Sequence, residues 1–552
     1  MSSVSYPASS SRKADATRHV GTREERKGLL SDPDDTLADK QWSLHSPDAD
    51  PSKTDSISRP WSRKRILCAA ISLIVLLATG AFARSFLLSP PQGSPRIPAH
   101  PNLAFHGDEL RSNGTHDFRR TVLIVSIDGL RADYLDRGLT PHLLDISKQG
   151  LRAKSLIPIF PVSHLLLPHR PPHVPLVQTL TFPNHWALMT GLYAESNGIV
   201  GNNFWDPITE TEFHYNRISS AWVSRWWLGE PMWETAGKSN IITANLMWPG
   251  PPKTTSGATS TYFVPWKDHV PLQEKLDQLV RWIDLPLEER PQLLMAYEPS
   301  LDQAGHKAGP MSKLVNITLE QVDLFAKNLH TALEERNLTD IVDVVFVSDH
   351  GMTDTSHPEL IYMDDIIGKE AYAAIEHEDG WPAMGLWFNE KVNATHNLLL
   401  LEAAAAKSNG KFEVFTRDTM SERWHFSHNE RIAPIYVVPK IGYVLTNHGE
   451  ENAAMSKGSH GYDNHAKEMQ AMFVAHGPFS SVVKILHQRR ETTLSRRLLS
   501  NPNVGWHSTA DDVYVMDPFE NVQIYSLVMR LLGVEAVAPT NGSSTFWDKY
   551  FS

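Results

Sequence analysis

Cysteine is almost absent from this chain, and its absence excludes several classes of protein. The 552 residues include one Cys, so the chain is neither a disulfide-stapled scaffold nor a cysteine-rich zinc module. An excess of positive charge is also missing: the formal net charge is −11, whereas a protein that forms stable nucleic-acid complexes usually has a basic surface. Hydrophobic residues at 41% and charged residues at 21% exclude collagen-like, wholly disordered and multi-span membrane proteins. A metal site would therefore have to use Asp and His.

The first 65 residues hold few large apolar side chains and show no sustained periodicity. They are rich in Ser, Asp, Lys and Arg, so we expect residues 1–65 to form a disordered tail. Residues 66–83 carry no charge and, as a helix, would rise about 27 Å, close to the ~30 Å hydrocarbon core of a bilayer. This predicts one transmembrane helix. A buried core helix is the alternative, and a cleaved signal peptide would have to lie nearer the N-terminus.

Charges flanking the predicted span indicate its orientation. Arg63, Lys64 and Arg65 precede it, so the positive-inside rule predicts a single-pass type II protein with a cytosolic tail and a domain that is extracellular or in the lumen of the secretory or vacuolar system. Residues 84–118 are expected to form a stalk, because prolines recur within them, and residues 119–552 the main domain. Five N-x-S/T sequons beyond the span suit a glycoprotein: Asn113, Asn316, Asn337, Asn393 and Asn541.

From about residue 119, short apolar segments alternate with helical stretches. This pattern predicts an α/β fold with a parallel sheet flanked by helices. Four segments are dense in apolar residues, as strands covered on both faces should be. They are 121–127 (TVLIVSI), 292–297 (QLLMAY), 342–347 (VDVVFV) and 469–475 (MQAMFVA). Ligands of open α/β sheets collect outside the carboxyl ends of the strands, so chemistry is expected there.

Carboxylates and imidazoles flank all four segments. They are Asp128 after the first, Asp302 and His306 after the second, Asp349 and His350 after the third, and His460 ahead of the fourth. Each has an ordinary alternative as a turn cap or a polar loop residue. Together, three carboxylates and three imidazoles suit two zinc ions, which accept both oxygen and nitrogen ligands. A two-metal site stabilises the attacking and leaving oxygens of an in-line displacement at phosphorus.

A candidate nucleophile is Thr181. It stands two residues before Pro183, and proline is favoured in the first turn of a helix, where its missing N–H is not needed. Thr181 is therefore expected at a helix N-terminus, where free N–H groups and the positive end of the helix dipole attract a phosphoryl oxygen. A metal bound to the hydroxyl would favour its alkoxide. An ordinary N-cap threonine is the alternative.

Six motifs in this order resemble those of the nucleotide pyrophosphatase/phosphodiesterase family of the alkaline phosphatase superfamily, particularly its fungal type II membrane members. They are IDGLRADY (127–134), TFPNHWALMTGLYAESNGIVGNNFWDP (181–207), WPG (248–250), LDQAGH (301–306), SDHGM (348–352) and GSHGYDN (458–464). The similarity covers about residues 119–533. It implies an alkaline-phosphatase-like, mostly parallel sheet flanked by helices.

The resemblance also implies roles for individual residues. One zinc would be held by Asp128, Thr181, Asp349 and His350, and the other by Asp302, His306 and His460. Thr181 would attack phosphorus, and hydrolysis of the nucleotidyl-threonine would release a nucleoside 5′-monophosphate. Asn202 would bind a phosphate oxygen with Asn203 as its support, and Phe182 would pack on the nucleobase. The implied substrates are nucleoside triphosphates, dinucleotides or nucleotide sugars.

A second aromatic ring would complete the nucleobase site. Phe263 or Trp266 is a candidate because stacking tolerates any base, and an ordinary core aromatic is the alternative.

Residues 162–178 (VSHLLLPHRPPHVPLVQ) depart from the family pattern. The segments on either side run together almost directly in relatives. One interpretation is a retained intron or a gene-model error, and the other is a genuine lineage-specific loop; sequencing the transcript distinguishes them. The cysteine-rich modules of animal members are also missing, so functions that depend on those modules are not expected here.

Two kinds of rival function fit the same residues. A phosphomonoesterase or a phosphoethanolamine transferase could use the same metal core, but a monoesterase needs a cation, usually Arg, on the extra phosphate oxygens. The region of the nucleophile offers Phe182 and Asn202 instead. The rival from another class is a membrane-anchored binding protein that kept the fold and lost catalysis.

Overall fold

The computed structural model of the protein describes residues 109–160, 181–449, 455–484, 506–508 and 514–551. The predicted tail, transmembrane helix and most of the predicted stalk lie outside these ranges, as do residues 162–178. Within the ranges, no helix combines the length and the apolar character needed to cross a bilayer.

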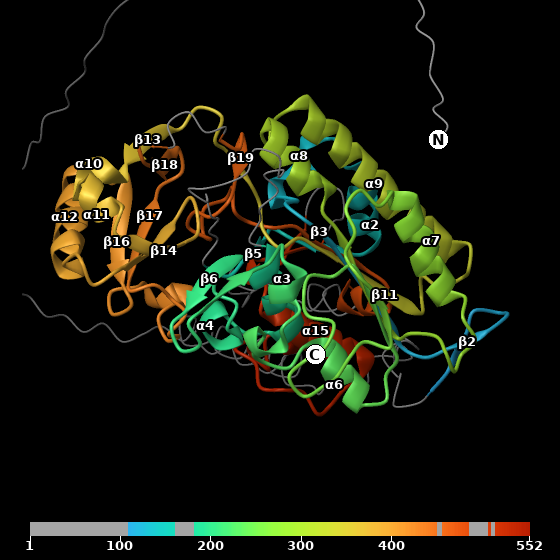
Figure 1. The fold of residues 1–552 in the computed structure, drawn as a ribbon. Helices are drawn as coiled ribbons and strands as arrows, with labels where there is room; N and C mark the ends of the chain where they lie inside the picture. The colour runs from blue at the N-terminus through green and yellow to red at the C-terminus, as the bar shows by residue number, and fades with distance from the viewer. Residues whose placement is uncertain (1–108, 161–180, 450–454, 485–505, 509–513, 552) are drawn as a thin grey trace, which may run out of the picture. The chain divides into compact units, whose positions relative to one another are not determined.

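Nine strands form the principal sheet within the described residues, in the order β21-β22-β4-β20-β11-β3-β10-β8-β9 (Figure 1). They are β3 (Thr121–Ile127), β4 (Leu151–Ala153), β8 (Thr243–Leu246), β9 (Tyr262–Val264), β10 (Leu293–Glu298), β11 (Val342–Val347), β20 (Phe473–His476), β21 (Trp506–Ser508) and β22 (Tyr514–Met516). Strands β11, β3, β10, β8 and β9 are parallel, as predicted. The sheet is nevertheless mixed, because β20 runs antiparallel to β11 and β4.

The strand directions decide which residues meet at one edge of the sheet. The last residue of β10, Glu298, pairs with Ile127 at the end of β3, and Val347 of β11 pairs with Ser126, so these three strands end together. Strand β20 starts where β11 ends, because its first residue pairs with Val347. The segment ahead of β20, which contains His460, therefore reaches the same edge that the other strands reach at their carboxyl ends.

Helices cover both faces of the sheet. Alternate residues of its central strand, β3, point to opposite faces, and apolar residues on both faces need to be covered. Leu123, Val125 and Ile127 pack in one buried apolar cluster, and Val122 and Ile124 pack in another. The first cluster includes side chains of α2 (Pro141–Gln149), α7 (Leu272–Ile283), α8 (Ser300–Ala308) and α9 (Lys313–Glu334). The second includes α3 (Thr181–Thr190), α6 (Met232–Lys238) and α15 (Gln523–Leu532), which Figure 1 shows on the other side of β3.

A smaller subdomain is inserted between the SDHGM and GSHGYDN motifs. It contains β13 (Glu359–Tyr362), α10 (Met363–Ile367), α11 (Lys369–Tyr372), β14 (Ile375–Asp379), β15 (Met384–Phe388), α12 (Ala394–Lys407), β16 (Phe412–Thr416), β17 (Ile435–Pro439) and β18 (Tyr443–Thr446). Strands β14, β15, β17 and β16 form an antiparallel sheet with its own apolar core. The chain then returns through β19 (Gly458–Ser459), which pairs with β12 (Thr353–Asp354).

The hairpin of β6 (Asn203–Asp206) and β7 (Thr211–His214) joins the region around Asn202 to this subdomain. The backbone N–H of Trp205 donates to Asp379 Oδ1 at 3.1 Å, and the Trp205 ring stacks on His377 with centroids 3.9 Å apart. The hairpin starts directly after Asn202, so these contacts help to fix that residue.

The last ten residues of the region predicted as a stalk fold against the domain. Strands β1 (Arg111–Ser112) and β2 (Asp117–Phe118) form a short hairpin. Phe118 is buried, and the guanidinium of Arg290 lies 3.8 Å from the centroid of its ring. The folded region therefore begins before Arg119.

Candidate active site

The structure brings together all six carboxylate and imidazole residues that the sequence placed near strand ends. They form two groups, Asp128 with Asp349 and His350, and Asp302 with His306 and His460. Within each group, one ligand atom from each residue lies within 4.8 Å of the others. All six side chains are buried, with exposed fractions of 4% or less.

The first group forms where β3 and β11 end side by side. His350 Nε2 lies 3.3 Å from Asp128 Oδ1 and 3.1 Å from Asp349 Oδ2. The other ring nitrogen, Nδ1, donates to the carbonyl of Gly351 at 2.9 Å. This hydrogen bond leaves the lone pair on Nε2, which faces the two carboxylates.

The second group uses one face of α8. Asp302 and His306 are four residues apart, and His306 Nε2 lies 3.3 Å from Asp302 Oδ1. His460 Nε2 lies 3.6 Å from the same oxygen. The helix approaches the end of β3 closely because residue 129 is glycine: at its φ of +70°, a Cβ would lie 3.1 Å from the Cα of Asp302.

The two groups adjoin each other. The rings of His350 and His460 stack with centroids 3.6 Å apart and an interplanar angle of 15°. The six residues therefore line one continuous region, which is the arrangement that a two-metal site requires.

The electrostatics of this region fit a divalent cation. Asp128 Oδ1, Asp349 Oδ2 and both carboxylate oxygens of Asp302 are buried and have no hydrogen-bond partner among the described residues. Buried charges without partners are costly, so such oxygens normally pair or bind a metal. Burial raises the pKa of Asp128 well above its ordinary value, and the nearby carboxylates of Asp349 and Asp302 raise it further. A cation would relieve both effects, and the mixture of oxygen and nitrogen donors suits zinc.

Thr181 lies beside the first group. Helix α3 begins at Thr181, as the position of Pro183 predicted, and the side chain is 1% exposed. Its Oγ1 donates to Asp128 Oδ2 at 3.0 Å. The Thr181 hydroxyl therefore lies at a helix N-terminus and also beside the group of Asp128, Asp349 and His350.

Asn202 lies next to the same helix start. Its Oδ1 accepts a hydrogen bond from the backbone N–H of Phe182 at 3.3 Å, and its Nδ2 has no hydrogen-bond partner among the described residues although it is buried. The amide thus retains a donor for a further acceptor. Asn203 makes a different contact: its Oδ1 lies 3.1 Å from His214 Nδ1.

Phe182 is only partly buried. Its ring lies 5.4 Å from Tyr215 and 5.9 Å from Trp227, between centroids. Of the two residues considered as a second base-stacking ring, Phe263 is half-buried and contacts Trp222, whereas Trp266 is 54% exposed. Trp266 is therefore not an ordinary core aromatic.

Two further residues contact the site, and the sequence did not identify them. Tyr297 Oη donates to Asp128 Oδ2 at 2.5 Å, and burial raises the pKa of this tyrosine. His185 Nδ1 donates to the carbonyl of Thr181 at 2.6 Å and its Nε2 accepts from Ser126 Oγ at 2.8 Å. Burial lowers the pKa of His185 to about 4, so the ring is neutral at pH 7. His185 stands four residues, or about one helical turn, after Thr181, and this spacing could have indicated from the sequence that His185 lies near the site.

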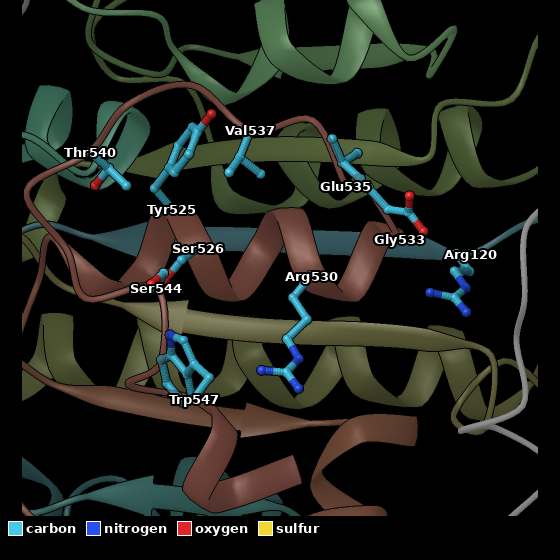
Figure 2. A pocket seen from close by; sticks show the side chains of 11 residues that line it. Arg120, Tyr525, Ser526, Arg530, Gly533, Glu535, Val537, Thr540, Ser544 and Trp547 are labelled. Carbon is cyan, nitrogen blue, oxygen red and sulfur yellow. The ribbon is translucent and has the colours of Figure 1, made fainter. Parts of the chain in front are cut away.

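A hollow of about 360 Å³ lies elsewhere in the protein (Figure 2). It is lined by Arg120, which precedes β3, and by residues of α15 and the C-terminal segment such as Tyr525 and Trp547. Asp128 follows the opposite end of β3. The hollow is therefore separate from the candidate active site.

Comparisons with known proteins show which proteins the chain is similar to. Residues 122–164 and 169–463 match the family model described as type I phosphodiesterase/nucleotide pyrophosphatase. An uncharacterised pyrophosphatase/phosphodiesterase of Schizosaccharomyces pombe is 34% identical over 439 residues, which are 78% of this chain and 80% of that protein. Ectonucleotide pyrophosphatase/phosphodiesterase 1 of Saccharomyces cerevisiae is 29% identical over 476 residues, and the match spans 76% of this chain but only 57% of that protein.

A solved structure is similar over most of the described domain. It is murine ectonucleotide pyrophosphatase/phosphodiesterase 5, an inactive threonine-to-alanine variant in complex with AMP. The TM-score is 0.63 at 27% identity, and the match covers 79% of this chain and 100% of that chain.

Proposed function

Because this chain belongs to the type I phosphodiesterase/nucleotide pyrophosphatase family, we propose that it is a two-zinc hydrolase of nucleotide phosphodiester and pyrophosphate bonds. Thr181 is the nucleophile in this proposal, and the product is a nucleoside 5′-monophosphate. The observation that carries it is the hydrogen bond between Thr181 Oγ1 and Asp128 Oδ2, within the region lined by both ligand groups. The AMP in the complex of the murine relative supports a nucleotide as the substrate.

The proposed zinc ligands are the members of the two groups together with Thr181. One zinc would be held by Asp128, Asp349, His350 and Thr181, and the other by Asp302, His306 and His460. When bound, the two ions supply Lewis-acid stabilisation of the attacking and leaving oxygens at phosphorus.

The reaction follows from what the chain's own groups can do. Asp128 Oδ2 accepts the hydrogen bond of the Thr181 hydroxyl and orients its oxygen, and the positive end of the α3 dipole attracts a phosphoryl oxygen. Attack by Thr181 Oγ1 forms an O–P bond while the hydroxyl proton passes to its hydrogen-bond acceptor, Asp128 Oδ2, and the bond between phosphorus and the leaving alcohol or phosphate breaks. Water then hydrolyses the nucleotidyl-threonine, which restores the hydroxyl and releases the monophosphate. Nδ2 of Asn202 is available to a non-bridging oxygen throughout.

The choice between a phosphodiester and a phosphomonoester substrate depends on the charge of the side chains next to Thr181. A monoester carries an extra anionic oxygen that needs a cation, usually Arg. Asn202 is uncharged and offers an N–H donor there, which fits the single anionic charge of a diester. The half-buried ring of Phe182 offers a surface for a nucleobase. These two side chains favour a nucleotide diester over a phosphomonoester.

We expect the purified chain to turn over p-nitrophenyl thymidine monophosphate with a kcat/KM on the order of 10²-fold or more above that for p-nitrophenyl phosphate. Both substrates release the same chromophore, so one assay compares them directly. A preference for the monoester would contradict the proposed function and favour a phosphomonoesterase. Absence of turnover together with absence of bound zinc would favour a binding protein.

A second prediction concerns residues 162–178. The described residues on both sides of this segment are anchored to each other: Ile159 N–H donates to Asn184 Oδ1 at 2.9 Å, and Asn521 Nδ2 donates to the same oxygen at 2.8 Å. Deletion of 162–178 would leave three residues to join Phe160 to Thr181, a reach of up to about 15 Å. The match to the family model is interrupted within the same segment.

We therefore expect the deletion variant to keep its diesterase kcat/KM within about threefold, and to be more stable by no more than about 2 kcal/mol because a shorter loop has a smaller closure entropy. Turnover and thermal melting of the two forms measure these effects. A loss of activity greater than about tenfold would show that the segment contributes to the site and is a genuine part of the protein.

A further inference from the structure

A hydroxyl group from outside the six motifs contacts the outer nitrogen of His306. Ser456 Oγ lies 2.8 Å from His306 Nδ1, 3.0 Å from the carbonyl oxygen of His306 and 2.5 Å from the carbonyl oxygen of Gly458. Ser456 is 150 residues from His306 along the chain. The contact exists only because β19 pairs with β12 and brings this return segment over α8.

The proton positions follow from these three distances. A hydroxyl has one proton, and a carbonyl oxygen can only accept. Two oxygens 2.5 Å apart repel unless a proton lies between them, so the Ser456 proton points to Gly458. A lone pair of Ser456 Oγ then faces His306 Nδ1, which must carry a proton and donate. The lone pair of the His306 ring is consequently on Nε2, the nitrogen that faces Asp302 Oδ1.

The backbone around Ser456 is held from two sides. Thr355 Oγ1 donates to the Ser456 carbonyl at 2.8 Å, and the N–H of Lys457 donates to the His306 carbonyl at 3.0 Å. These backbone contacts hold the hydroxyl beside His306. The acceptor for His306 is therefore a side chain, which a substitution can remove. In the first group the acceptor for His350 Nδ1 is a backbone carbonyl, which no substitution removes.

We propose that Ser456 is a positioning residue for the second metal: its hydroxyl fixes the tautomer and the ring orientation of His306, so that Nε2 is ready to bind the ion. The proposal rests on the two-zinc function above. Groups that accept from the outer nitrogen of a ligating histidine typically contribute 10- to 100-fold to metal affinity or activity. Ser456 thus sets the affinity of the site that contains Asp302, without contacting the metal or the substrate.

The test uses a pair of variants with matched shape. Ser456→Thr keeps the hydroxyl, and Ser456→Val replaces it with a methyl group of similar size. The metal-free full chain is titrated with zinc in competition with a chromophoric chelator, and turnover is measured separately. We expect Ser456→Val to bind one of its two zinc ions about 10- to 100-fold more weakly and Ser456→Thr to stay within about threefold of the wild type. Excess zinc should restore the turnover of Ser456→Val.

The outcomes separate this proposal from the function on which it rests. A wild type that binds fewer than two zinc ions contradicts the two-metal function and this inference with it. A wild type with two zinc ions and a Ser456→Val variant of unchanged affinity overturns the inference alone. Equal weakening in both variants also overturns it, because the hydroxyl is then not the cause. Thermal melting of the metal-free forms checks folding, and Ser456→Ala replaces the valine variant if valine is not accommodated.

Discussion

Replacement of Thr181 by alanine should reduce the diesterase kcat/KM by at least about 10⁴-fold, because the oxygen that forms the bond to phosphorus is removed. The zinc content should stay near two ions per chain, since Thr181 is only one of the proposed ligands and Asp128, Asp349 and His350 remain close together. Steady-state turnover and metal analysis of the same purified sample measure the two effects.

Two controls make this result specific. Thr181→Ser keeps a hydroxyl at the start of α3 and should retain measurable turnover. Thr190→Ala removes a threonine that is equally buried at the other end of the same helix, where its Oγ1 donates to the carbonyl of Trp186 at 2.7 Å. This variant should be slightly less stable but as active as the wild type. Turnover by Thr181→Ala at a rate comparable to that of Thr190→Ala would eliminate Thr181 as the nucleophile.

The second large effect is expected from Asp302→Asn, which removes a charge with almost no change in shape. Both oxygens of Asp302 lack a hydrogen-bond partner among the described residues, so the carboxylate is available to a metal. We expect zinc content to fall from two ions to one and turnover to fall by more than about 10²-fold, since even partners outside the ligand shell contribute 10- to 100-fold.

The same substitution should change stability in opposite directions with and without metal. In the presence of a chelator, Asp302→Asn should raise the melting temperature, because the charge of Asp302 is one of the two that raise the pKa of Asp128. With excess zinc the wild type should be the more stable form, since a ligand at 1,000 times its Kd stabilises the folded state by about 4 kcal/mol. Melting curves with and without zinc measure both effects. A variant that keeps two zinc ions would contradict the ligand assignment.

Asp343→Asn is a suitable control for this experiment. Asp343 is also a buried carboxylate, but it lies near the start of β11, away from the site, and accepts a hydrogen bond from Phe479 N–H at 2.9 Å. Burial raises its pKa to about 7, so a neutral amide should be tolerated there. We expect this variant to keep two zinc ions and normal turnover.

Much of the fold and site was predictable because the signals are local. Residues 121–127 and 342–347 are dense in apolar residues, and both form central strands with the predicted bounds. Asp128 and Asp349 follow these runs within two residues, so any parallel pairing of the strands brings them to one edge. Pro183 likewise indicated the start of α3 two residues earlier, because proline fits the first turn of a helix and not its interior.

The direction of β20 was not predictable from its composition. An apolar strand buried on both faces has the same sequence pattern whether it runs parallel or antiparallel to its neighbour, so the pattern carries no information on direction. The antiparallel pairing of β20 with β11 is what brings His460, which precedes the strand, to the edge where Asp349 follows its own strand.

The amino-acid sequence by itself determined which side chains are candidates for the site and near which strand ends they stand, because adjacent residues determine strands, helix starts and the types of side chain that follow them. Only the tertiary structure decided how each ligand is oriented. Asp128 Oδ2 is held by Thr181 and Tyr297, which are 53 and 169 residues away, and its Oδ1 is thereby left to face His350. Ser456 Oγ likewise contacts His306 Nδ1 from 150 residues away. These contacts depend on strand order and on the close approach of segments that are distant in the chain, and no local pattern specifies either.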